Sequence, residues 1–270
     1  MNIRRISTTF ILFALFLILS SHELFLKSDS YFFEEERQGE LYLFNGTFDK
    51  SENVITRDRI IDPQIIGPEY TFRPSAEDYY DKGAITYLKF KTGKTGTYVA
   101  GISTKPRAIE LSGEKFTAYL EHEGLAEVMA DREAKGVTDQ VAHEQYAKHV
   151  KAILQVGESR SDHFSTVLGY PIEFIPLTNP YKLAVGDTMS FKLLYLGKPL
   201  GAQTVHVSSR MASRETDPTE RALRTSAEGT VRFPIESKGQ WYIATIHMLE
   251  SEEANFDYES QWATLTFEVK

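Results

Sequence analysis

The stretch Gln261-Trp262-Ala263-Thr264-Leu265-Thr266-Phe267-Glu268-Val269, close to the end of the 270-residue chain, decides the fold class because its side chains alternate with a period of two. Successive side chains of a β-strand point to opposite faces of a sheet, so this alternation separates an apolar face from a more polar one. The pattern predicts a half-buried strand of a β-sandwich. The apolar face carries Ala263, Leu265, Phe267 and Val269, and the other face carries Trp262, Thr264, Thr266 and Glu268.

Similar short apolar or alternating segments precede this stretch and are separated by turn residues, which predicts further strands. We expect a C-terminal β-sandwich domain over residues 165–270, preceded by a polar, serine-rich boundary at 157–163. The segments are residues 172–176, 188–196, 204–208, 230–235 and 240–248.

The first half of the chain shows the same sequence pattern from residue 22 to about 111, with glycine and proline between short apolar runs. Strands at this spacing predict a small antiparallel sandwich or barrel. We therefore expect an N-terminal β-rich domain over residues 22–160. The fold class is mainly β, with two β-sandwich-like domains.

A helical insert at about residues 113–149 is expected to interrupt the first domain. Ser112 precedes apolar residues on helical spacing that end near Gly136. Thr138 is placed to cap a second helix, from Asp139 to His149.

The first 21 residues predict a cleaved signal peptide. Arg4 and Arg5 precede the apolar run 10–19, and Ser20 and Ser21 follow it. The run is shorter than the roughly 20 residues that span a bilayer. We expect a soluble periplasmic or secreted protein after cleavage. The chain contains no cysteine, so neither an acylated-cysteine anchor nor a disulfide is available.

The charge of the chain excludes nucleic acid as a partner. There are 30 lysines and arginines against 38 aspartates and glutamates, a formal charge of −8. Loss of Arg4 and Arg5 with the signal peptide leaves 28 against 38, or −10. A nucleic-acid-binding domain needs a basic surface.

Cleavage after Ser21 would make His22 the first residue, whose amine and imidazole can chelate one metal ion together. Cleavage after Leu19 would instead leave Ser20, Ser21 and His22, whose nitrogens form a square-planar site suited to Cu(II) or Ni(II). A histidine that lies at the junction by chance remains the alternative.

Several motifs are spread over nearly all of the mature chain: His22-Glu23-Leu24-Phe25-Leu26, the passage 146–152, Gly169-Tyr170-Pro171 with its continuation to Pro176, Asn179-Pro180-Tyr181, Gly186-Asp187, Gly197-Lys198-Pro199, residues 239–248, and residues 260–268. Together they resemble an exported bacterial family of unknown function, domain of unknown function 4198, often labelled as a substrate-specific component of nickel or cobalt uptake. The resemblance implies a two-part, β-rich periplasmic protein whose second part is like the transthyretin or carboxypeptidase-regulatory sandwich. It also implies a metal ion as ligand and a membrane transporter or envelope protein as partner.

Histidines are the main candidate metal ligands, because cysteine is absent and imidazole suits nickel, copper and zinc. We expect His22 and His247 to be ligands, with His163 as a third candidate in the interdomain linker. His247 shares a strand face with Trp241 and Ile243, so a packed core histidine is the alternative. His163 could equally be a loop residue.

Other motifs do not support an enzyme. His143 and His149 are six positions apart, whereas a helical zinc site of a metalloprotease needs histidines four apart. No Gly-x-Ser-x-Gly elbow is present. The favoured hypothesis is a non-catalytic periplasmic protein that binds nickel, cobalt or copper for delivery, uptake or sensing. The alternatives are a β-sandwich that binds a glycan or a protein, and a copper oxidase that uses a terminal amine and two histidines.

Overall fold

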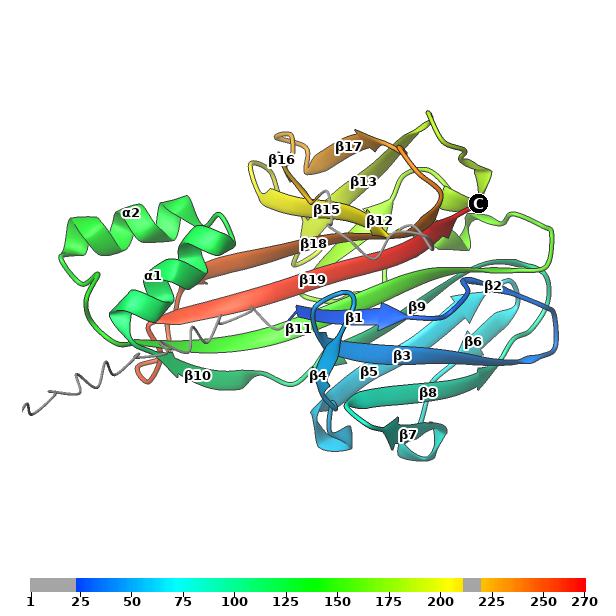
Figure 1. Ribbon diagram of the computed structural model, residues 1–270, viewed down its shortest axis with the longest axis horizontal. Helices are drawn as coiled ribbons and strands as arrows, with labels where there is room; N and C mark the ends of the chain where they lie inside the picture. Colours follow the sequence, from blue (N-terminus) through cyan, green and yellow to red (C-terminus); the bar gives the residue numbers. More distant parts are fainter. Residues whose placement is uncertain (1–22, 211–219) are drawn as a thin grey trace, which may run out of the picture.

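The computed structural model describes residues 23–210 and 220–270, and their fold is mainly β, as predicted. Three sheets contain the strands, and a helix pair lies at one end (Figure 1). His22 and the expected signal peptide lie outside the described residues.

The five-stranded sheet contains β1 (Glu23–Lys27), β3 (Gln38–Gly46), β8 (Ile85–Lys91) and β7 (Tyr79–Lys82), with β4 (Ser51–Asn53) beside β3. The ten-stranded sheet runs in the order β16 (Arg221–Arg224), β15 (Thr204–Arg210), β18 (Gly239–Glu250), β19 (Tyr258–Val269), β11 (Ala142–Val156), β9 (Gly96–Thr104), β5 (Ile60–Gly67) and β6 (Tyr70–Phe72), with β10 (Arg107–Leu111) and β2 (Phe32–Phe33) beside β11. The four-stranded sheet contains β12 (Ile172–Pro176), β13 (Thr188–Tyr195), β14 (Lys198–Pro199) and β17 (Thr230–Pro234). Short 3-10 helices are η1 (Arg57–Arg59), η2 (Ala76–Asp78), η3 (Asp162–Ser165) and η4 (Pro180–Lys182).

The ten-stranded sheet is the shared layer of two sandwiches. One of its faces packs against the five-stranded sheet, around a core that includes Leu41, Tyr98 and Val150. The other face packs against the four-stranded sheet, around Phe191 and Trp241. In Figure 1 the long strands β11, β18 and β19 cross the molecule between these two outer layers.

The two halves of the chain meet through a parallel pair, β11 with β19, in register from Glu144 opposite Tyr258 to Ala152 opposite Thr266. Strands from both sides of the expected boundary therefore share one sheet. The expected boundary at 157–163 covers the loop after β11 and the first two residues of η3, and the division into two domains stays a prediction.

The structure corrects the expectation that the last strand is half-buried. Strand β19 is buried on both faces, because β1 covers the face that carries its threonines. The hydroxyl of Thr264 donates to the Leu24 carbonyl oxygen at 2.7 Å, and that of Thr266 donates to the Leu26 carbonyl oxygen at 2.5 Å. Both hydroxyls are therefore satisfied without water.

The helical insert is shorter than expected. Helix α1 (Gly113–His122) and helix α2 (Ala126–Lys135) form a pair broken at Gly124, whose φ is 68°. The predicted second helix at 139–149 is wrong, because residues from Ala142 onward belong to the fifteen-residue strand β11. Within residues 23–210 and 220–270, no helix combines the length and apolarity needed to cross a membrane.

A buried ion pair joins β11 to the C-terminal layer. Lys151 Nζ lies 2.9 Å from Glu173 Oε2, and each side chain is only 1% exposed. Lys151 also donates to the Thr166 carbonyl oxygen, while Glu173 accepts hydrogen bonds from the backbone N–H groups of Leu168 and Gly169. Each charged group of the pair therefore has hydrogen-bond partners in the backbone as well as its ion-pair partner.

Removing one member of this pair should destabilise the protein strongly. Lys151→Met leaves the Glu173 charge buried without its cation, and we expect a loss of about 3–5 kcal/mol in the free energy of unfolding. Lys151→Met combined with Glu173→Gln should recover much of that loss, because no unpaired charge remains. Urea unfolding followed by circular dichroism measures both variants. Equal stability of the single variant and the wild type would contradict the prediction.

Candidate functional site

Strand β1 packs near β18, because Phe25 shares a buried cluster with Tyr242 and Ala244. Because Val205 and Val207 face the C-terminal core, the alternation of β15 turns His206 to the opposite face, toward Ala244 of β18. The charges of Glu123, Glu220 and His206 influence the pKa of Glu23. We call this group the Glu23 cluster, and its members are Glu23, Glu123, His206, Glu220 and Tyr242.

His206 is held by a carboxylate on one ring nitrogen only. Its Nδ1 lies 3.1 Å from Glu220 Oε1, and the Tyr242 hydroxyl donates to Glu220 Oε2 at 2.6 Å. The hydrogen bond to Glu220 raises the pKa of His206. The other ring nitrogen, Nε2, is buried and has no hydrogen-bond partner among the described residues. A histidine oriented through Nδ1 by a carboxylate, with Nε2 left for a ligand, is the usual arrangement of a metal-binding imidazole.

Glu23 is a carboxyl group whose charge is disfavoured in the folded protein. Burial raises its pKa to about 8, and the nearby carboxyl groups of Glu123 and Glu220 raise it further, whereas His206 and Lys148 act in the opposite direction. Burial also lowers the pKa of Lys148 to about 7. A carboxyl group that holds its proton at neutral pH marks a place where a cation would be stabilised.

A second buried carboxyl group lies under α1. The hydroxyls of Ser260 and Tyr119 donate to Glu144 Oε1, and Trp262 Nε1 donates to the Ser260 oxygen at 3.0 Å. Burial raises the pKa of Glu144 to about 7. Because these donors satisfy Glu144, we assign it a structural role.

His22, the first expected ligand, lies outside the described residues, but its neighbour Glu23 belongs to the cluster. His247, the second, lies on the other face of the ten-stranded sheet, the face shared with Trp241 and Ile243. Strand β1 covers the face that carries His206. The structure therefore does not bring His247 to the side on which β1 begins.

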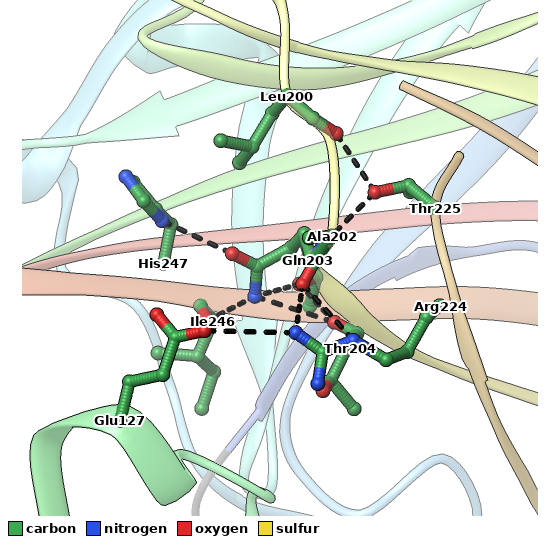
Figure 2. A network of polar contacts seen from close by, with 10 residues as sticks. Glu127, Leu200, Ala202, Gln203, Thr204, Arg224, Thr225, Ile246 and His247 are labelled. Atoms are coloured by element: carbon green, nitrogen blue, oxygen red, sulfur yellow. Dashed lines mark hydrogen bonds and ion pairs between the residues drawn. The ribbon is translucent and has the colours of Figure 1, made fainter. Parts of the chain in front are cut away.

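The surroundings of His247 are those of a packed histidine. Its Nδ1 lies 3.0 Å from Gln203 Oε1, and its ring meets the Tyr195 ring edge to face at 4.5 Å. The Gln203 amide also donates to the Ile246 carbonyl oxygen and the Thr245 hydroxyl. Figure 2 shows Gln203 between His247 and Ile246. Burial lowers the pKa of His247.

His163, the third expected ligand, lies in η3, where its Nδ1 is 3.1 Å from the Ser161 hydroxyl. That hydroxyl also bonds with the backbone of Thr97, so His163 belongs to a loop that closes onto β9. His163 and His247 therefore contact different residues in different elements, and no contact joins them.

His149 is structural. Its Nδ1 lies 2.7 Å from the Ser103 hydroxyl and its Nε2 lies 2.7 Å from Gln261 Oε1. Burial lowers its pKa, so the neutral ring uses both nitrogens inside the protein. The Ser103–His149 pair is buried away from solvent and does not form an open catalytic site.

The described residues alone contain no group of three histidine, aspartate or glutamate side chains arranged to hold a metal ion. His206 was not among the ligands predicted from the sequence. The one signal for it was its position between Val205 and Val207, which predicts a histidine on the side of β15 opposite the core.

The carboxylate of Glu220 should control the pKa of His206. Glu220→Gln removes the charge that stabilises the imidazolium, so the pKa of His206 should fall toward its ordinary value of about 6.5 or below it. Tyr242→Phe is the control, because it keeps the carboxylate and should leave the pKa of His206 raised. Proton NMR titration of the imidazole measures both variants. An unchanged pKa in Glu220→Gln would show that Glu220 does not orient His206.

Comparison with solved structures gives only distant likenesses. The D0–D1 domain of intimin is 10% identical, with 91% of this chain and 97% of that chain covered and a TM-score of 0.22. Trypsin-activated α-2-macroglobulin from Escherichia coli is 11% identical with a TM-score of 0.23, and a mutant α-2-macroglobulin from Salmonella is 9% identical with a TM-score of 0.24. These matches cover 92% and 91% of this chain but only 16% and 15% of the respective macroglobulin chains.

A search of curated proteins finds no match to this chain. A family described as a domain of unknown function, DUF4198, matches residues 19–249. The matched range includes every member of the Glu23 cluster and most of the three sheets. The chain therefore belongs to the DUF4198 family.

Proposed function

We propose that the protein binds a divalent transition-metal ion, nickel, cobalt or copper, at its mature N-terminus. The ligands are the terminal amine and imidazole of His22 and the Nε2 atom of His206. The observation that carries this proposal is the buried Nε2 of His206, which has no partner among the described residues while Glu220 holds the other ring nitrogen.

Chain connectivity supports His22 as the completing ligand. His22 is bonded to Glu23, and consecutive Cα atoms are only about 3.8 Å apart. Phe25 packs on Tyr242 with ring centroids 5.1 Å apart, and Tyr242 bonds to Glu220, so the donors of a processed N-terminus would start close to the cluster. This ligand set replaces His247, which faces the opposite layer, with His206.

The donor types fit the proposed metals. Two imidazoles and an amine are nitrogen ligands, which suit nickel and copper better than magnesium or calcium. Glu23 and Glu123 would balance the charge of the bound cation. The amine ligand forms only after signal cleavage, so export is part of the proposal. The proposed role is delivery, uptake or sensing together with a membrane transporter or envelope protein, without catalysis.

Isothermal titration of correctly processed protein with Ni(II), Co(II) and Cu(II) tests the ligand set. We expect micromolar or tighter binding of at least one metal. His206→Ala should weaken binding by at least about tenfold, which corresponds to about 1.4 kcal/mol. Glu220→Gln should weaken it by about 10–100-fold, because the imidazole loses its orienting partner.

His247→Ala is the matched control and should bind the metal like the wild type. A protein with extra residues before His22 should lose the amine ligand and bind more weakly. Absence of binding at micromolar metal, or equal affinity of His206→Ala and the wild type, would refute the proposed site.

Metal affinity should rise with pH. A metal ion binds deprotonated ligands, so it must displace protons from the imidazoles and lower the protonation of Glu23, whose pKa is about 8 in the metal-free protein. Affinity should therefore increase from pH 6 to pH 8 and level off above that. Glu23→Gln should reduce the slope, because one titrating group is gone. Chelator competition at several pH values measures this, and an affinity independent of pH would contradict it.

A further inference from the structure

Strand β10 is an edge strand with a neighbour on one side only. It pairs with β11, where Arg107 lies opposite Tyr146, and with no other strand of the described residues. Strand β5 lies beside the preceding strand β9, but its pairing begins at Ile60 opposite Thr104, and no described strand continues it beside β10. In Figure 1, β10 lies along the lower margin of the sheet, at the end that carries the helices. An unpaired strand edge is a template for a strand of another chain.

The outer edge of β10 presents the backbone groups of Ala108 and Glu110. Along a β-strand, the backbone groups of successive residues point to alternate sides. The His143 carbonyl oxygen accepts a hydrogen bond from the residue that precedes β19, so the next residue, Glu144, directs its backbone groups toward β10. Glu144 lies opposite Ile109, and the two neighbours of Ile109 therefore point outward. Two N–H groups and two carbonyl oxygens are thus available to a second strand.

Strand β10 lacks two features that protect strand edges from pairing. It has five residues without glycine or proline, and the first four are exposed. By contrast, β17 ends at Pro234, and β6 has only three residues. Proline and short length are common ways to block an edge. The charged side chains around β10 leave the backbone groups open and select which segment can pair with them.

Positive charge gathers at one end of β10. Lys105 and Arg107 are exposed, and no ion pair joins either of them to a carboxylate within the described part of the chain. The Arg59 side chain donates to the Lys105 carbonyl oxygen at 3.4 Å. Its guanidinium also lies 5.7 Å from the ring centre of Tyr146, the residue opposite Arg107. Set against Asp58, which precedes Arg59 in the chain, these three cations leave an excess of positive charge that fits an acidic segment.

We propose that β10 binds an extended acidic segment of a partner protein, which adds a strand to the ten-stranded sheet at the position that continues β5. Hydrogen bonds to the backbone of Ala108 and Glu110 hold the segment, and its carboxylates pair with Lys105 and Arg107. An apolar side chain of the segment packs on Ile109, which is 37% exposed. This interaction goes beyond the proposed metal site and does not depend on it.

A second copy of this chain fits the edge less well. Two antiparallel strands related by a two-fold axis place each residue opposite one from the same face of the sheet. Arg107 and Glu110 lie on opposite faces of β10, because three positions separate them. The face that carries Arg107 has Ile109 and Leu111 as its other members in β10 and no carboxylate. A symmetric contact between two β10 strands would therefore leave Arg107 without an acidic partner.

Fluorescence anisotropy with labelled heptapeptides tests the proposal. The peptide ETVTVTE has an acid at each end, so either strand direction places one near Lys105 and Arg107, and KTVTVTK is its basic counterpart. We expect the wild type to bind ETVTVTE with a dissociation constant below about 1 mM and to bind KTVTVTK at least about tenfold more weakly. The double variant Lys105→Glu with Arg107→Glu should reverse this preference.

Ala108→Pro tests the strand edge itself. Proline removes an outward N–H group that β11 does not use, so β10 should stay in place while binding of ETVTVTE weakens by about tenfold or more. Ala108→Thr keeps the N–H group and is the matched control, which should bind like the wild type. Thermal unfolding confirms that each variant is folded.

The proposal is overturned if the wild type does not bind ETVTVTE or binds both peptides equally. It is also overturned if folded Ala108→Pro binds like the wild type, or if the folded double variant still prefers ETVTVTE. The double variant decides the matter alone should Ala108→Pro fail to fold. A reversible dimer of the peptide-free wild type in analytical ultracentrifugation, dissociated by Ala108→Pro, would overturn the proposal in favour of a second copy at this edge.

Discussion

The parallel pairing of β11 with β19 is the constraint on which the rest of the structure depends. These strands come from opposite halves of the chain, and their nine-residue register places them at the middle of the ten-stranded sheet. A parallel pair inside a sheet is normally covered on both sides. Here the N-terminal layer covers one face and the C-terminal layer covers the other, so the two sandwiches cannot separate without breaking this pair.

The same pairing creates the candidate site. Because β19 is central, its threonine hydroxyls are available to hold the carbonyl groups of β1. Strand β1 is thereby fixed over the face that carries His206, and the pKa of its first residue, Glu23, is influenced by a histidine more than 180 positions later in the chain. A site of this kind requires both halves of the chain, which explains why neither half alone indicates it.

The sequence patterns correctly predicted features that depend on neighbouring residues of the same strand. The alternation in β19 correctly separated its two faces, and the alternation in β18 correctly placed His247 with Trp241 and Ile243. The pattern failed for β11, since Lys148, His149 and Lys151 are polar residues buried by tertiary contacts and the segment does not alternate like a half-exposed strand. The junction after the signal peptide indicated His22. The choice between His206 and His247 as its partner depends on which layer covers which face, and no local pattern contains that information.

The buried ionisable groups show why the Glu23 cluster differs from the structural polar groups of this fold. Lys151 and Glu173 neutralise each other, and backbone groups complete their hydrogen bonds. His149 is neutral and uses both ring nitrogens. In the Glu23 cluster, by contrast, a carboxylate orients His206 while its second nitrogen has no partner among the described residues, and Glu23 is driven to hold a proton. Stability alone does not favour such an arrangement, because burying a polar atom without a partner is destabilising. A cation bound there would remove both penalties at once, since it would accept the lone pair of His206 and stabilise the ionised form of Glu23.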